Sequence, residues 1–279
     1  MHSLPPVGAQ LREWRQRRRL SQLDLAGHAE VSTRHLSCME TGRALPSREM
    51  VLRLADRLEV PLRERNRLLT AAGYAPLYRE HALADPAMQP AAQAVQRVLK
   101  AHEPYPALAV DRHWQMVACN RMVTMLLAGL PAELLVPPVN VLRLSLHPDG
   151  LAPRIVNLGP WRRHLLHRLQ QQVRASGDPV LAALADELQA LPMPHGMEPT
   201  TDNEHAHAHL PDDSGVYVPL RIRTAAGVLN LISIITVFGT PTDITLSELA
   251  LETFFPADEE TAATLRHLAD ADGGAQPVG

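Results

Sequence analysis

Apolar residues recur at helical spacing in five short stretches between residues 8 and 72, and polar turns separate the stretches. This pattern predicts five short helices around one small core. Ser21 is a candidate N-cap, and Asp24 lies three residues on, where an acidic group favours the positive helix end. The five helices are expected from about residue 8, after Ser21, over Thr33–Glu40 after the N-cap Ser32, from Ser47 to Leu58, and after Pro61.

Beyond residue 104 the pattern changes to short strands mixed with helices. Strands are expected at 106–111, 114–120, 216–224, 227–238 and 246–255, and helices around 91–102, 121–128, 141–146, 161–175, 179–191 and 258–268. Grouped helices beside an antiparallel sheet indicate an α+β domain. We therefore predict an all-α domain at 1–75, a connector at 76–104, an α+β domain at 105–270 and a flexible tail at 271–279.

Length and composition narrow the class of protein. The chain has 279 residues, of which 46% are hydrophobic and 20% charged, so a disordered or fibrous chain is not expected. Two cysteines exclude a disulfide framework, and no apolar run is long enough for a membrane span. The first six residues lack the pattern of a signal peptide. We expect a soluble, cytoplasmic protein.

Charge is distributed unevenly along the chain. Residues 1–80 carry 14 arginines and 9 acidic residues, a net charge of +5, whereas the remainder carries a net −8. A basic part within an acidic chain is typical of a domain that meets a polyanion. The alternative is an arginine-rich solvated surface, and the charge pattern alone does not decide between the two.

The motifs of the first domain do favour one interpretation. Leu20–Ala26, Val31–Ser37 and Met39–Ser47 resemble the phage-repressor (Xre) class of helix-turn-helix domains, over about the first 75 residues. Two consecutive helices under a basic first helix suit DNA binding. Glu30 departs from the family, which usually has glycine in this turn, so we expect a slightly different turn geometry. A helical bundle that binds nothing is the structural alternative.

The resemblance implies which side chains would meet DNA. In such domains the second helix of the motif enters the major groove with its N-terminal residues, which here begin with Thr33 and Arg34. Arg34 can pair bidentately with guanine, whereas Thr33 offers a methyl and a hydroxyl group. The predicted DNA-binding set is Gln22, Ser32, Thr33, Arg34, His35, Ser37, Cys38 and Arg43.

Within this set the roles differ. Gln22 resembles the family's phosphate-anchoring glutamine, and Arg43 with Arg12 or Arg15 are candidates for phosphate contacts that position the domain without reading sequence. Each arginine could instead be a surface charge. Cys38 is more typical of a small packing residue than of a redox sensor, because no resolving cysteine lies nearby.

The second domain opens with a strand, an Asp turn, a strand ending in Asn120 and a helix, which resembles a PAS sensor domain. Taken whole, about 90% of the chain resembles the MmyB-like transcription regulators. The stretches that carry this resemblance are 64–66, 71–76, 105–120, 140–148, 161–165 and 238–241. The resemblance implies a bacterial DNA-binding regulator whose second domain holds a small apolar molecule such as a fatty acid, with double-stranded operator DNA and a second copy of the chain as partners. No other cofactor is expected.

A PAS-type pocket would lie between the sheet and the flanking helices, and such sites are mostly apolar with a few placed polar groups. Arg143 is a candidate anchor for a ligand carboxylate. The expected wall residues are Trp114, Met116, Met122, Met125, Leu126, Leu165 and Ile235, and the expected polar residues are Asn120, Arg143, His147 and His164. Apolar residues at these spacings are often simply core.

The sequence also bears on metal binding, catalysis and protein interaction as alternative functions. His205, His207 and His209 alternate in a polar stretch, which favours adventitious metal binding over a physiological site. No phosphate loop, HExxH, GxSxG or paired-cysteine motif is present, so we do not expect an enzyme. The alternative to a ligand-controlled regulator is a protein-interaction or antitoxin-like module without ligand sensing.

Overall fold

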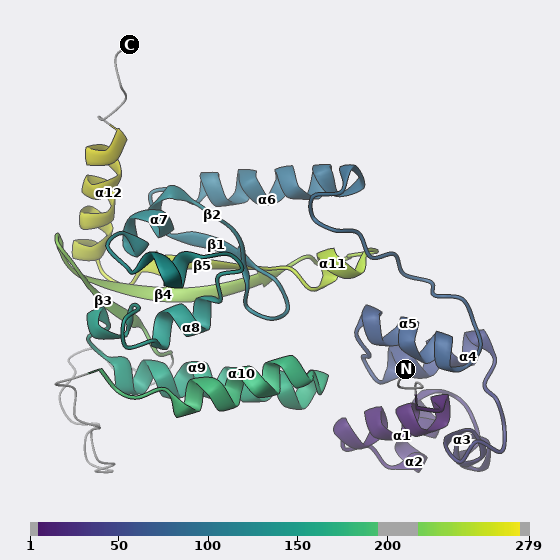
Figure 1. Cartoon of the computed structure of the whole chain (residues 1–279). Helices are drawn as coiled ribbons and strands as arrows, with labels where there is room; N and C mark the ends of the chain where they lie inside the picture. Colours follow the sequence, from purple (N-terminus) through teal and green to yellow (C-terminus); the bar gives the residue numbers. More distant parts are fainter. Residues whose placement is uncertain (1–4, 195–216, 274–279) are drawn as a thin grey trace. The chain divides into compact units, whose positions relative to one another are not determined.

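The computed structural model describes residues 5–194 and 217–273, and this part of the chain forms two compact units (Figure 1). The first unit contains the chain up to Asp85, together with Arg174–Gly177 and Gly239–Ser247. The second contains Pro86–Val173, Asp178–Phe238 and the chain from Glu248 onward. The histidines at 205, 207 and 209 lie outside the described residues.

The first unit contains the five predicted helices. They are α1 (Val7–Arg17), α2 (Gln22–His28), α3 (Thr33–Glu40), α4 (Arg48–Arg57) and α5 (Leu62–Ala71). Serine caps begin three of them: Ser21 forms a capping box with Asp24, and Ser32 and Ser47 each accept a hydrogen bond from the backbone N–H three residues on. The prediction of five helices is confirmed.

The core of this bundle is built from the apolar positions of the helical pattern. The fully buried large side chains include Leu11, Leu25, Leu36, Met39, Leu54, Leu58, Leu68 and Leu69. Gly42 follows α3 with φ +75°, as a left-handed helix end requires. Glu30, between α2 and α3, also has a positive φ of 56°. Glu30 therefore has the left-handed backbone conformation that glycine favours, and the altered turn geometry that we expected from the sequence is not seen.

The second unit is built on a five-stranded antiparallel sheet with the order β2-β1-β5-β4-β3. Its strands are β1 (Ala107–Val110), β2 (Met116–Cys119), β3 (Leu220–Thr224), β4 (Gly227–Val237) and β5 (Ala250–Pro256). Its principal helices are α6 (Gln89–Ala101), α7 (Arg121–Leu127), α8 (Val141–Leu146), α9 (Leu158–Ser176), α10 (Pro179–Ala190) and α12 (Glu259–Gly273). The predicted α+β, PAS-like architecture is confirmed.

The helices of the second unit cover both faces of its sheet. The helices α8, α9 and α10 lie on one face, and α6 and α12 lie on the other (Figure 1). The larger apolar cluster includes Leu108, Leu231 and Phe254 of the sheet, Trp161 and Leu165 of α9, and Leu265 of α12.

Two predicted strands begin four residues later than expected: β3 at Leu220 instead of 216, and β5 at Ala250 instead of 246. We predicted a strand from Leu246, but Ile244–Ser247 forms the short helix α11 and β5 begins at Ala250. The carboxylate of Asp243 accepts hydrogen bonds from the backbone N–H groups of Thr245 (2.9 Å) and Leu246 (3.4 Å). An aspartate that binds the backbone ahead of it favours a helical turn over an extended strand.

Candidate functional site

The leading end of α3 presents polar side chains to solvent. Ser32 Oγ accepts a hydrogen bond of 3.1 Å from the His35 N–H and so caps the helix. Arg34 and His35 are exposed and Thr33 is half-buried, whereas Leu36 is fully buried on the opposite face. Leu36 therefore anchors the helix to the core, while the first turn remains accessible to solvent.

A buried ion pair holds the far end of the same helix. Arg15 of α1 donates to both carboxylate oxygens of Glu40 at 2.6 and 2.9 Å, and Gln22 of α2 donates to Glu40 Oε2 at 2.7 Å. Burial raises the pKa of the Glu40 carboxyl, but the hydrogen bonds from Arg15 and Gln22 outweigh it and lower the pKa overall. Hydrogen bonds to one carboxylate therefore connect α1, α2 and α3.

This ion pair corrects one expectation from the sequence. The sequence predicts a phosphate contact for Arg12 or Arg15. Arg15 is buried against Glu40, whereas Arg12 is exposed. Gln22 is half-buried, and its side-chain amide already donates to Glu40. Of the remaining predicted residues, Arg43 is exposed and Ser37 and Cys38 are half-buried. Their contact with DNA stays a prediction.

The second unit contains an apolar cavity between the strands of its sheet and the helices beside them. Among the described residues that line it, the polar side chains besides the Trp161 indole are those of Ser145 and Glu252. The lining residues are Pro106, Leu108, Met116, Val123, Leu126, Leu127, Val141, Leu142, Leu144, Ser145, Leu151, Trp161, Leu165, Leu220, Ile222, Leu231, Glu252 and Phe254.

Three of the predicted wall residues, Met116, Leu126 and Leu165, line this cavity. The other wall residues lie elsewhere: Met122 is buried in the core, Met125 packs against the core, and Ile235 is 38% exposed. Trp114 is buried beneath the Arg168 guanidinium, and its indole N–H donates to Gln172. For these four residues a structural role is visible and a ligand contact stays a prediction.

The predicted polar residues are engaged within the protein. Asn120 is buried and caps α7, and its side chain also bonds the backbone of Ala107, Leu99 and Tyr105. Arg143 pairs bidentately with Glu187, and His147 Nδ1 accepts from the Asp149 N–H. His164 stacks on Trp161, and burial, with Arg168 nearby, lowers its pKa.

Sequence reasoning missed the charged group of the cavity. Glu252 on β5 is 5% exposed, and its Oε1 accepts a hydrogen bond of 2.6 Å from Ser233 Oγ of β4. Arg168 of α9 lies 3.7 Å from the same oxygen, and burial lowers the pKa of Arg168 although Glu252 opposes this effect. The available signal was a single acidic residue inside an apolar strand pattern.

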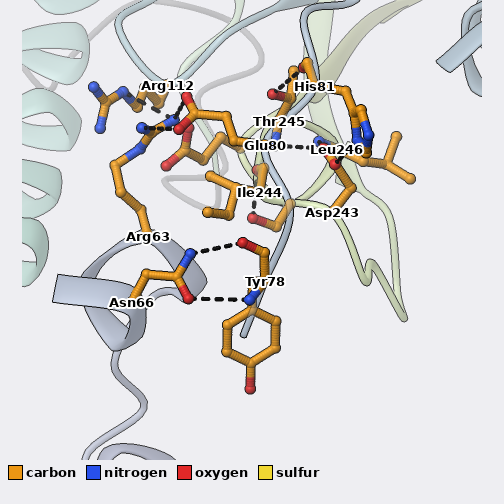
Figure 2. A network of polar contacts seen from close by, with 12 residues as sticks. Arg63, Asn66, Tyr78, Glu80, His81, Arg112, Asp243, Ile244, Thr245 and Leu246 are labelled. Atoms are coloured by element: carbon orange, nitrogen blue, oxygen red, sulfur yellow. Dashed lines mark hydrogen bonds and ion pairs between the residues drawn. The ribbon is translucent and has the colours of Figure 1, made fainter. Parts of the chain in front are cut away.

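The segment Gly239–Ser247 lies between β4 and β5 in the sequence but belongs to the first unit. Figure 2 shows its contacts. His81 Nδ1 lies 2.7 Å from Asp243 Oδ2, and Thr245 Oγ1 donates to the His81 carbonyl at 2.6 Å. Asn66 of α5 donates to the Tyr78 carbonyl and accepts from its N–H. Hydrogen bonds thus connect α5, residues 77–81 and the segment between the two strands.

These features define a class, a helix-turn-helix domain followed by a ligand-binding domain, and comparisons with known proteins agree. A helix-turn-helix family model matches residues 6–68, and the model of the MmyB-like transcription regulator ligand binding domain matches residues 91–268. The chain belongs to the MmyB-like transcription regulator family. It is accordingly a DNA-binding transcription regulator with a ligand-binding domain, as the resemblance implied.

Two other comparisons add little. No curated protein matches the chain. A solved structure described as "Structure of an RNA-binding Light-Oxygen-Voltage Receptor" is similar at 13% identity and a TM-score of 0.26, with 95% of this chain and 64% of that chain covered. This chain thus spans less than two thirds of that structure's length. Within the described residues, no helix combines the length and apolarity needed to cross a membrane.

Proposed function

We propose that this protein binds a specific DNA sequence through the leading end of α3 and that a small apolar molecule in the second unit controls this binding. The observation that carries the proposal is the exposure of Arg34 at the first turn of a capped, internally anchored helix. An exposed arginine there can reach guanine in the major groove.

The charge of the first 80 residues supports the same proposal. Their net charge of +5 favours contact with phosphates, and Arg12 and Arg43 are exposed and able to make such contacts. A homodimer in the cytoplasm suits this function, because two copies of the domain would read two half-sites about one helical turn apart.

The apolar cavity supports the second part of the proposal. Its lining offers many hydrocarbon contacts and few polar ones, which suits a molecule with an alkyl chain, a fatty acid being one example. Ligand binding can change DNA affinity only if it favours one arrangement of the DNA-reading domains over another. The segment Gly239–Ser247 could transmit the effect of the ligand to the first unit. It belongs to the first unit, and it follows β4, the strand that carries the cavity residue Leu231.

Fluorescence anisotropy with the DNA upstream of the protein's own gene tests the DNA-binding part. We expect binding that a shuffled duplex does not reproduce and that weakens steeply between 50 and 200 mM salt, by a factor on the order of 10³ if six or more phosphates are contacted. Arg34→Ala is expected to weaken binding by about 5- to 150-fold, which corresponds to about 1–3 kcal/mol.

Arg266→Ala is the matched control, because it removes an exposed arginine of α12 in the second unit. Equal losses for Arg34→Ala and Arg266→Ala, or equal binding of the shuffled duplex, would refute the proposal. The ligand part is tested by native mass spectrometry of the protein purified from its host. An additional mass on the folded chain supports it, and an empty second unit under gentle conditions opposes it.

A further inference from the structure

Two short segments interrupt the second unit in the sequence and belong to the first unit. Arg174–Gly177 contains the end of α9, and Gly239–Ser247 lies between β4 and β5. The chain returns to the second unit at Asp178 after the first segment and at Glu248 after the second. Asp178 and Glu248 are therefore the junctions through which a movement of the second unit would reach the two segments.

Each segment is bonded to other parts of the first unit. Arg18 of α1 donates a hydrogen bond of 3.4 Å to the Ala175 carbonyl, and Thr245 Oγ1 donates one of 2.6 Å to the His81 carbonyl. The helix α1 is joined in turn to α3 by the buried ion pair at Glu40. A movement of the segments would thus reach elements that support the DNA-reading helix.

One arginine bridges the two junctions. Arg112, in the turn between β1 and β2, has Nη1 3.7 Å from Asp178 Oδ2 and Nε 3.7 Å from Glu248 Oε2. His113 Nε2 lies 3.0 Å from the same oxygen of Asp178. The side chains of Asp178 and Glu248 are 15% and 17% exposed, so solvent and salt screen these ion pairs less than they screen pairs at the open surface.

The turn between β1 and β2 is held in one conformation by hydrogen bonds. Asp111 Oδ1 accepts from the backbone N–H groups of His113 (2.8 Å) and Gln115 (2.9 Å). Trp114 has a φ of 64°, and its indole N–H donates to Gln172 of α9 at 2.8 Å. Because the turn is bonded both within itself and to α9, a shift of α9 or of β2 would move the turn as a whole.

Both elements that adjoin this turn also line the cavity. Met116 is the first residue of β2, and Trp161 and Leu165 belong to α9; all three are lining residues. Closely packed side chains transmit a displacement, because they leave little free space to absorb it. A ligand that moves β2 relative to α9 would therefore move the turn, and with it the contacts to the two junctions.

We propose that Arg112 couples the cavity to the DNA-reading unit by holding both junctions at once. A ligand-dependent shift of the turn then reaches Arg174–Gly177 and Gly239–Ser247 together, rather than one segment alone. This inference rests on the proposed ligand control of DNA binding and names the residue that transmits it. Because coupling between two sites is reciprocal, loss of Arg112 should uncouple the two affinities and leave each site able to bind.

Fluorescence anisotropy of the full chain on DNA, with and without 1-decanol or decanoate, tests this proposal. We expect saturating probe to change the DNA affinity of wild type by about five-fold or more, the usual size of allosteric coupling, and that of Arg112→Gln by less than about two-fold. Calorimetry should show both proteins binding the probe equally well, because Arg112 does not line the cavity. Arg121→Gln is the matched control, since Arg121 is 39% exposed and pairs with Glu103 in the second unit. It should keep the wild-type response.

Hydrogen exchange read by mass spectrometry examines the junctions without any ligand. In Arg112→Gln, peptides covering 174–178 and 239–248 should both exchange about three-fold faster or more, whereas Arg121→Gln should keep the wild-type rates. Unchanged exchange in either segment, or a wild-type probe response in Arg112→Gln, would overturn the coupling role and leave ligand control intact. If neither probe changes the DNA affinity of wild type, the proposed ligand control fails and this inference falls with it.

Discussion

Replacing Glu40 with glutamine would remove one buried charge and preserve the shape of its side chain. The Glu40 side chain is 1% exposed, and three donors from Arg15 and Gln22 surround its carboxylate. In the variant the Arg15 guanidinium would remain buried without a counter-charge. Breaking such a pair costs about 3–5 kcal/mol, and the Arg15 side chain keeps 11% exposure, so we expect about 3 kcal/mol.

A loss of this size is a large part of the stability of a small domain, which is commonly about 5–15 kcal/mol. Hydrogen exchange read by mass spectrometry across a urea series measures the unfolding of α1 to α3 separately from that of the second unit. We expect the midpoint of these peptides to fall in Glu40→Gln, while peptides of the β4–β5 pair keep theirs. The DNA affinity of the variant should fall with the population of folded α3.

Glu49→Gln is the matched control, since the Glu49 carboxylate is 86% exposed in its ion pair with Arg53. Exposed pairs of this kind contribute about 0.2–1 kcal/mol at most. The pKa of Glu40 is lowered in the folded chain, so its contribution is present above the unfolded value of about 4.3 and is lost as the pH falls through the folded value. The difference between wild type and Glu40→Gln should therefore shrink under acid. Equal stability of the two variants at neutral pH would refute the reasoning.

Three further predictions follow from the structure. Glu30→Gly should raise the free energy of unfolding of the first unit by about 1 kcal/mol, and with it the urea midpoint, because Glu30 has a φ of 56° that costs a side chain roughly this amount; a lower midpoint would contradict it. Asp243→Ala should leave ligand affinity unchanged in calorimetry but reduce the effect of the ligand on DNA affinity, since it removes the contact with His81; an unchanged ligand effect would exclude this relay. Glu187→Gln should leave the affinity for 1-decanol, an alkyl-chain probe of the cavity, within two-fold in calorimetry, because Arg143 and Glu187 pair outside the cavity lining; a larger loss would contradict this.

The sequence predicted the helices well, because neighbouring residues determine where a helix begins and ends. Ser21 with Asp24, Ser32, and Gly42 mark helix ends in ways that do not depend on tertiary contacts, and each lies where expected. The strand predicted from Leu246 began too early, because the carboxylate of Asp243 directs a helical turn that apolar patterning does not report.

The candidate sites were less predictable, because they depend on residues far apart in the sequence. Nothing local distinguishes Arg15 from Arg12, yet Glu40, 25 residues away, buries one of them. Glu252 likewise becomes the polar group of a cavity only when β5 pairs with β4 and faces Arg168 of α9. The wall residues expected in the pocket were chosen for their apolar character on predicted strands and helices, which does not separate a cavity wall from a filled core.

Selection of bound duplexes from a random DNA pool, run in parallel with wild type and Arg34→Ala, tests the DNA-reading role of α3 most directly. We predict that wild type enriches two half-sites with centres about 10 base pairs apart and that Arg34→Ala loses the preference for guanine at one position of each half-site. A wild-type pool without a consensus, or the same consensus from both proteins, would contradict the account.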